Sequence, residues 1–244
     1  MRKIRAVIAA LTLLLGAATV ATQTAQPVAA AAPFRAVFIG DSYTSLDYVP
    51  LGAPVPWSSR LCAELGWTCV NLAHGGTGYL QDYADPVVGW HGSFTAQIPA
   101  AVAAAPAAVF VLGGRNEIGQ EGTSTWQNGV TAFYATLRAG LPNAAIYGLS
   151  PLWDDDPVPS GIGVMRTVVQ AAVTNVGGRY LNMGDPFLGQ PELLVADGVH
   201  PNDAGMDLLK NLVMSFLTLP PRTRTPNPST VPMPYPYPRP STRP

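Results

Sequence analysis

The stretch Phe34-Arg-Ala-Val-Phe-Ile-Gly-Asp-Ser42 decides the expected fold of this chain. Its apolar residues Ala36–Ile39 stop at Gly40, which is typical of a short buried strand closed by a turn. In an open α/β sheet, the residues that follow the carboxyl end of a strand lie in the crevice where ligands bind. The sequence therefore predicts that Ser42 stands at the mouth of a site. A serine becomes a nucleophile there once a base takes its proton and donors stabilise the oxyanion.

Apolar runs and helical patterns alternate along the rest of the chain. The last helix is expected from Pro201 or Asn202 onward, because apolar residues then recur at the three-four spacing of a buried stripe. Strands alternating with helices predict a parallel sheet covered on both faces. The segment between His74 and Gly92 is expected to be a long loop. The other expected strands are 67–73, 107–112, 144–149 and 179–183, and the other expected helices are 57–65, 93–105, 124–139 and 160–176.

The first residues, 1–32, have the order of a secretory signal peptide. Three basic residues among the first five precede an apolar run over 6–20, and small residues follow, with cleavage expected after Ala30 or Ala32. An uncleaved membrane anchor is the alternative, but the run is short and rich in Ala for that role. We therefore expect a protein that is secreted, either extracellular or associated with the cell wall, without stable membrane insertion.

The last residues, 220–244, differ in composition from the rest. Ten of these 25 residues are Pro, and no apolar periodicity remains. Such a segment cannot bury a core and is expected to be extended or disordered. It is either a spacer that contacts the cell wall or a partner, or simply a solvated tail.

Residues 33–219 amount to one domain, long enough to bury a core. This domain holds all 15 acidic residues and seven of the 14 basic ones, so its net charge is −8. An acidic domain argues against nucleic acid as a partner, since phosphates need a basic face. It argues equally against binding to anionic lipid. We expect a monomer that acts on a small-molecule or polysaccharide substrate.

Cys62 and Cys69 are the only cysteines. In an exported protein an isolated pair predicts a disulfide, here between a helix and the next strand. A metal or redox pair is the alternative, but the two-residue spacing and the further ligands of such sites are missing. No metal site is predicted.

Three strand ends offer groups that are useful for acyl transfer. Ser42 follows the first strand, Gly76 the second and Asn116 the third. Glycine lets a backbone N–H approach a substrate closely, because no side chain intervenes. The N–H groups of Ser42 and Gly76 and the side-chain amide of Asn116 could form an oxyanion hole.

The base expected for this site is His200. It follows Asp197 by three residues, with Gly198 in the turn, so the carboxylate can reach one ring nitrogen while the other faces outward. Asp197 would fix the tautomer and stabilise the imidazolium. The alternative is a structural histidine at the start of a helix.

Four motifs in this order carry a family resemblance: Gly40-Asp-Ser42, Asn71-x4-Gly76, Gly114-x-Asn116 and Asp197-x-x-His200. They resemble the signature blocks of the SGNH/GDSL hydrolase family. The resemblance implies a three-layer α/β/α, flavodoxin-like fold with a five-stranded parallel sheet. It also implies ester hydrolysis through a serine acyl-enzyme without a cofactor. By motif match, Ser42, His200 and Asp197 would be catalytic, and Ser42, Gly76 and Asn116 would form the oxyanion hole.

The chain departs from the family pattern at three positions. Tyr43 replaces the usual Leu at a position expected to pack rather than react, and Glu117 replaces the usual Asp, which could alter how its loop is braced. Arg115 either lines the cleft, where it would meet an acidic or polyol substrate, or forms a surface ion pair. The candidate substrate-binding residues are Arg115, Trp153, Trp90 and Tyr43.

These features favour an exported serine esterase that cleaves a carboxylic ester, with deacetylation of a polysaccharide as the more specific hypothesis. A lipase or lysophospholipase of the same fold is the first alternative. A non-catalytic cell-wall or glycan-binding protein on the same scaffold is the second. The acidic run Asp154–Asp156 is interpreted as a solvated loop, because it lacks the spaced ligands of a calcium site.

Overall fold

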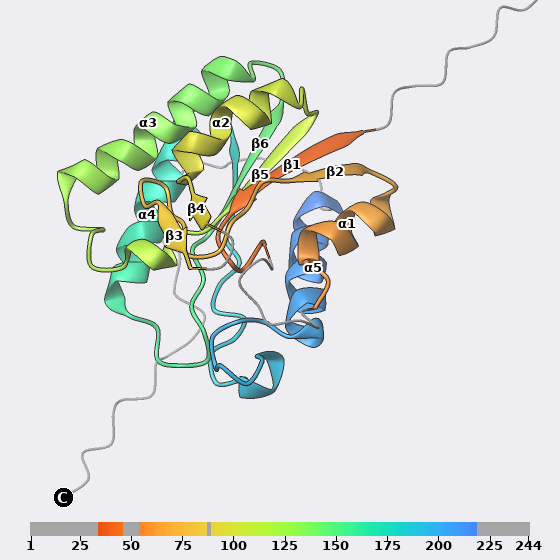
Figure 1. Cartoon of the computed structure of the whole chain (residues 1–244), viewed down its shortest axis with the longest axis vertical. Coiled ribbons are helices and arrows are strands. Elements are labelled where there is room, and N and C mark those ends of the chain that lie inside the picture. The colour runs from red at the N-terminus through yellow and green to blue at the C-terminus, as the bar shows by residue number, and fades with distance from the viewer. Residues whose placement is uncertain (1–33, 46–53, 87–88, 219–244) are drawn as a thin grey trace, which may run out of the picture. The chain divides into compact units, whose positions relative to one another are not determined.

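The computed structural model describes residues 34–45, 54–86 and 89–218. The predicted signal peptide and the predicted disordered tail lie outside these residues. One parallel sheet runs through the described domain, in the order β2-β1-β5-β6-β7 (Figure 1). Its strands are β1 (Arg35–Gly40), β2 (Thr68–Asn71), β5 (Ala108–Leu112), β6 (Ala145–Leu149) and β7 (Arg179–Leu181).

The strand order creates a switch point between β1 and β5. From β1 the chain moves outward to β2, then returns to the other side of β1 and continues through β5, β6 and β7. This is the flavodoxin-like order, in which ligands bind where the direction of winding reverses. The expected five-stranded α/β fold is confirmed, and the crevice beyond β1 and β5 is where its site should lie.

Each face of the sheet is covered by helices, as Figure 1 shows. Val37 and Ile39 pack on one face with α2 (Phe94–Ala103), α3 (Ser124–Gly140) and α4 (Ser160–Asn175). The alternate residues of β1, Ala36 and Phe38, pack on the other face with α1 (Trp57–Leu65) and α5 (Asp203–Thr218). Strand side chains point alternately to opposite faces, so a strand that is apolar throughout requires helices on both.

The segment expected to be a long loop contains a short hairpin. Strands β3 (Tyr83–Asp85) and β4 (Gly89–His91) are antiparallel, with Tyr83 opposite His91 and Ala84 opposite Trp90. The expectation of a loop throughout 74–92 was therefore wrong. Strands of three residues are too short for their alternation to be recognised in a sequence.

Several smaller features complete the domain. Cys62 of α1 and Cys69 of β2 form the predicted disulfide. Short 3₁₀ helices occur at η1 (Arg115–Glu117) and η2 (Pro191–Leu193). Within the described ranges, no helix has both the length and the apolar character needed to cross a membrane.

Candidate active site

Ser42 lies in a tight turn at the carboxyl end of β1. The N–H groups of Thr44 and Ser45 both donate to the Asp41 carbonyl, at 3.0 and 2.9 Å. Gly40 is required before this turn, because a Cβ there would lie 2.5 Å from the Leu112 carbonyl oxygen of β5. The Ser42 N–H finds no acceptor within the described part of the chain. It is therefore available to a ligand.

The loop after β2 presents a second N–H of this kind, that of Gly76. This residue has a φ of +73°, and a Cβ on it would lie 2.5 Å from the Tyr83 ring, so only glycine fits. Its carbonyl accepts a 3.0 Å hydrogen bond from Nε2 of Gln81, while its N–H donates to no described residue. The fixed carbonyl orients the neighbouring peptide groups.

Asn116 stands beside this loop. Its Nδ2 donates to the Thr77 carbonyl at 2.9 Å, which uses one of its two amide protons. The second proton is left for a ligand. Asn116 lies in the short 3₁₀ helix η1 after β5, and Ser42 lies in the turn after β1, so the two residues flank the switch point of the sheet.

Glu117, next to Asn116, is fully buried and anchors the segment that holds Gly76. Its carboxylate accepts four hydrogen bonds, so its charge is compensated within the core. The donors and their distances are Tyr79 N (2.9 Å), Leu80 N (2.8 Å), Gln81 N (3.1 Å) and Trp126 Nε1 (2.9 Å). The acid that replaces the usual Asp is thus the brace of this loop, reaching three successive backbone N–H groups.

His200 and Asp197 form a compact turn before α5. The His200 Nδ1 lies 2.7 Å from Oδ2 of Asp197, and Oδ1 accepts the N–H groups of Val199 and His200 at 2.8 and 2.9 Å. Partial burial by itself raises the pKa of Asp197, but the hydrogen bonds from His200 and Val199 outweigh it and hold that pKa below its usual value. The carboxylate therefore stays ionised, and Nε2 of the imidazole points away from it.

A cavity of about 260 Å³ brings these residues together. Three of its lining residues were not predicted, because no motif in the sequence marks them: Gln81, Tyr83 and Val199. The hairpin brings Tyr83 to the cavity, and only the fold could reveal that. The full lining is Ser42, Gly76, Gln81, Tyr83, Arg115, Asn116, Val199 and His200.

Arg115 reaches from the cavity into the interior. Its Nη2 lies 2.8 Å from Oδ2 of Asp154, and its guanidinium lies 4.5 Å from the Trp153 ring centroid. The expected ion pair exists, but both side chains are largely buried, so it is not a surface pair. The interpretation of Asp154 as a solvated residue is likewise wrong, because the Arg115 charge draws it inward.

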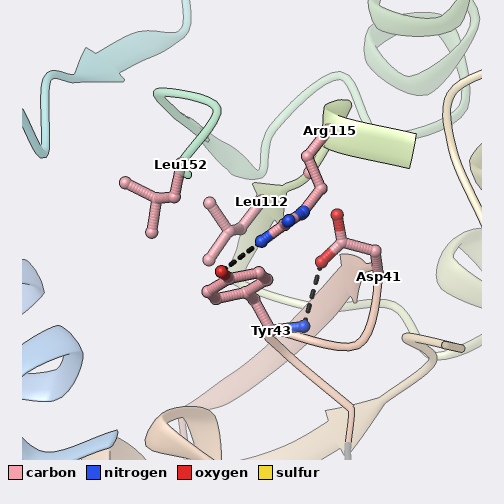
Figure 2. A pocket seen from close by; sticks show the side chains of 6 residues that line it. Asp41, Tyr43, Leu112, Arg115 and Leu152 are labelled. Atoms are coloured by element: carbon pink, nitrogen blue, oxygen red, sulfur yellow. Dashed lines mark hydrogen bonds between the residues drawn. The ribbon is translucent and has the colours of Figure 1, made fainter. Parts of the chain in front are cut away.

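The other candidate substrate-binding residues lie outside the cavity lining. Tyr43 is only 1% exposed and lies beneath the site, where Figure 2 shows the Arg115 side chain pointing to its phenol oxygen. Trp153 stacks on Arg115. Trp90 is 67% exposed, and its place in the register puts it on the opposite face of the hairpin from Tyr83 and His91. The His91 ring stacks on His74, with centroids 4.3 Å apart.

No described cluster of three or more His, Cys, Asp or Glu residues could hold a metal ion. What the cavity does assemble is a hydroxyl, an imidazole oriented by a carboxylate, two N–H groups without acceptors and an amide. These are the groups that acyl transfer requires.

A model of the GDSL-like Lipase/Acylhydrolase family matches residues 38–208. The chain belongs to this family. It is 31% identical over 195 residues to the GDSL lipase Rv0518 of Mycobacterium tuberculosis (strain ATCC 25618 / H37Rv), which covers 74% of this chain and 80% of that protein. The chain is thus a hydrolase of ester bonds, as the resemblance implied.

Solved structures support the fold. The psychrotrophic esterase EstA from Pseudoalteromonas sp. is 16% identical, with a TM-score of 0.58, covering 75% of this chain and 96% of EstA. A catalytic mutant of Axe2, an acetylxylan esterase from Geobacillus stearothermophilus, is 18% identical, with a TM-score of 0.53, covering 78% of this chain and 97% of Axe2. At these identities the likeness concerns the fold of the family.

Proposed function

We propose that this GDSL hydrolase is an exported serine esterase in which Ser42 is the nucleophile, His200 the general base and Asp197 its orienting acid. The observation that carries this assignment is the shared cavity. Ser42 and His200, separated by most of the chain in sequence, line the same space as Gly76 and Asn116.

In the proposed reaction, Oγ of Ser42 attacks the ester carbonyl while Nε2 of His200 takes its proton. The Nδ1–H donates to Asp197, which leaves Nε2 as the acceptor and stabilises the imidazolium. The oxyanion is stabilised by the N–H groups of Ser42 and Gly76 and the Asn116 amide. His200 then protonates the leaving alcohol. Water, deprotonated by His200, hydrolyses the acyl-enzyme and releases the acid.

We infer a short acyl group on a polyol, such as an acetylated polysaccharide. The cavity is small, and Gln81, Asn116 and Arg115 among its lining residues offer polar groups to a polyol. Long acyl chains would need an extended apolar surface, which this lining does not offer. The likeness to an acetylxylan esterase is consistent with this substrate class. A lipase activity is the alternative and predicts the opposite chain-length preference.

Export is part of the proposal. It rests on the leader-like sequence of 1–32, and the disulfide between Cys62 and Cys69 is typical of an oxidising compartment. Contact of the proline-rich tail 220–244 with the cell wall is proposed on composition alone.

A fluorophosphonate probe followed by peptide mass spectrometry tests the nucleophile. We expect labelling at Ser42 in the wild type and none in Ser42→Ala. A folded wild-type protein that resists labelling would instead favour the non-catalytic binding protein. Activity should also fall as the pH is lowered, because a protonated imidazole cannot accept the Ser42 proton. A flat profile would remove His200 from the role of base.

A panel of p-nitrophenyl esters from acetate to palmitate, run beside acetylated xylan, tests the substrate class. The proposal expects the highest kcat/KM for acetate and release of acetate from the xylan. A preference for long chains would replace it with the lipase alternative.

A further inference from the structure

The phenol of Tyr43 joins two turns that lie far apart in sequence. Its O–H donates to the Val199 carbonyl at 2.8 Å, across a separation of 156 residues. Tyr43 directly follows Ser42, and Val199 directly precedes His200. One hydrogen bond therefore connects the neighbour of the nucleophile to the neighbour of the base. A Leu, the usual family residue at this position, could pack there but could not form this bond.

The same oxygen also accepts a hydrogen bond from Nη1 of Arg115, drawn as a dashed line in Figure 2. The guanidinium lies 4.9 Å from the Tyr43 ring centroid and is held on its other side by Asp154. With one lone pair occupied by Arg115, the hydroxyl proton points to Val199. A cation that donates to a hydroxyl makes that hydroxyl a stronger donor in turn. Asp154, Arg115, Tyr43 and Val199 thus form one directed chain of hydrogen bonds.

The surroundings of Tyr43 keep its hydroxyl protonated and in place as a hydrogen-bond donor. Burial raises the pKa of Tyr43, so the phenol retains its proton. The ring is confined by Phe187, 5.9 Å away between centroids, and lies 6.3 Å from the His200 ring. The backbone N–H of Tyr43 donates to Oδ1 of Asp41 at 3.0 Å. Tyr43 is therefore fixed at both its backbone and its hydroxyl.

We propose that Tyr43 is a positioning residue that sets the position of Ser42 relative to His200. We propose further that Arg115 acts through Tyr43 by orienting its hydroxyl. The inference rests on the proposed function, because the relative position of Ser42 and His200 matters only if these two residues exchange a proton. It gives the Tyr43 hydroxyl a role in catalysis beyond packing. It also gives Arg115 a role that needs no contact with substrate.

The first test is Tyr43→Phe, which keeps the ring and removes only the hydroxyl. We expect kcat on p-nitrophenyl acetate to fall roughly 10- to 100-fold with KM changed less than about twofold, because a small misalignment of catalytic groups slows the chemical step. The rate of fluorophosphonate labelling at Ser42 should fall by a similar factor, since it depends on the same proton transfer.

Tyr134→Phe is the matched control. This phenol is also fully buried, and its hydroxyl pairs with Tyr79 at 3.1 Å on the opposite face of the sheet. Tyr134→Phe should lower the urea midpoint of unfolding about as much as Tyr43→Phe does, because the two hydroxyls are similarly buried. It should leave kcat within about twofold of the wild-type value. Equal kcat losses in both variants would reduce Tyr43 to a general contribution to stability.

Arg115→Lys and the double variant with Tyr43→Phe separate the two roles of Arg115. If Arg115 acts through Tyr43, its substitution lowers kcat in the wild-type background and has little further effect once the hydroxyl is gone. An effect on KM that persists in the Tyr43→Phe background would show direct contact with substrate and overturn that part of the inference.

The outcomes also separate this inference from the proposed function. An inert wild-type protein that does not label at Ser42 contradicts the proposed function. An active wild type with a fully active Tyr43→Phe variant contradicts the positioning role alone.

Discussion

The two halves of the site each contain a buried carboxylate, and the two carboxylates differ in the number of hydrogen bonds that they accept. Glu117, in the oxyanion half, accepts four hydrogen bonds. Asp41, in the nucleophile half, accepts the Tyr43 N–H on Oδ1, while its buried Oδ2 has no hydrogen-bond partner among the described residues. One half is tied into the core at several points, and the other depends on a few individual bonds.

The difference fits what each half does in the proposed reaction. Oxyanion donors act by being fixed before charge develops, so a loop held at three successive N–H groups suits them. The nucleophile and base exchange a proton in that reaction, and the hydrogen bond from Tyr43 to Val199 connects the turns that hold them. We therefore expect changes in the oxyanion half to affect stability and activity together, and changes in the nucleophile half to affect activity more selectively.

The largest effect on stability is expected from Glu117→Ala. It would leave three backbone N–H groups and the Trp126 indole N–H without their acceptor, and each buried unsatisfied group costs roughly 1–3 kcal/mol. We expect a loss of about 4 kcal/mol or more in the free energy of unfolding, measured by urea denaturation. Glu121→Ala, in the same loop but partly exposed, is the control and should cost less than about 1 kcal/mol. Similar losses in the two variants would refute Glu117 as the brace.

Gly76→Ala should cause the next largest effect, on activity. Its φ of +73° and the Tyr83 ring both oppose a Cβ, so the loop must shift and the Gly76 N–H with it. Loss of one oxyanion donor typically lowers kcat about 10²- to 10³-fold. Gly66 is a matched control, because its φ is +66° but nothing lies within 4 Å of an added Cβ.

Gly66→Ala should therefore cost roughly 1 kcal/mol of stability through backbone strain and leave kcat unchanged. If both glycine variants kept full activity, the Gly76 N–H would not be an oxyanion donor.

Much of this site could be predicted because its groups sit directly after strands. Once β1 and β5 were placed, the chemistry of Ser42 and Asn116 followed from the geometry of parallel sheets. The roles of Glu117 and Tyr43 could not be predicted, because each depends on a contact across many residues. The Tyr43 bond spans 156 positions, and no local pattern marks its acceptor, a backbone carbonyl.

The hairpin was missed for a related reason. Its strands have three residues each, and what defines them is their packing on the Gly76 loop, through Tyr83 on Gly76 and His91 on His74. Local sequence preference is weak over so few residues, and tertiary contacts decide the structure. The sequence thus predicted the candidate reacting groups, while the groups that hold them became apparent only in the fold.

The buried Asp41 carboxylate makes the free energy of unfolding depend on pH. Burial raises the pKa of Asp41 to about 6, against the opposing effects of the Tyr43 N–H and Arg115, from an ordinary value of 3.8. The folded chain thus holds this proton more tightly than the unfolded chain does. The contribution of Asp41 to the free energy of unfolding is therefore fully present below its ordinary pKa. This contribution is lost as the pH rises through about 6.

Asp41→Asn isolates this contribution, because it keeps the shape and an acceptor for the Tyr43 N–H without titrating. Relative to this variant, wild type should lose about 2 kcal/mol of unfolding free energy between roughly pH 4.5 and pH 7.5, as measured by urea denaturation. A pH-independent difference between the two proteins would mean that Asp41 titrates normally in the folded chain.

The smallest effect is expected from Trp90→Ala, which tests where the site ends. The exposed indole lies on the outward face of the hairpin, so its removal should change kcat/KM for p-nitrophenyl acetate less than about twofold. Acetylated xylan, which extends beyond the cavity, gives the sharper measurement. A raised KM for the polymer with unchanged turnover of the small ester would show that this face contributes to glycan binding, as the sequence suggested. Equal behaviour on both substrates would confine recognition to the cavity that Ser42 and His200 line.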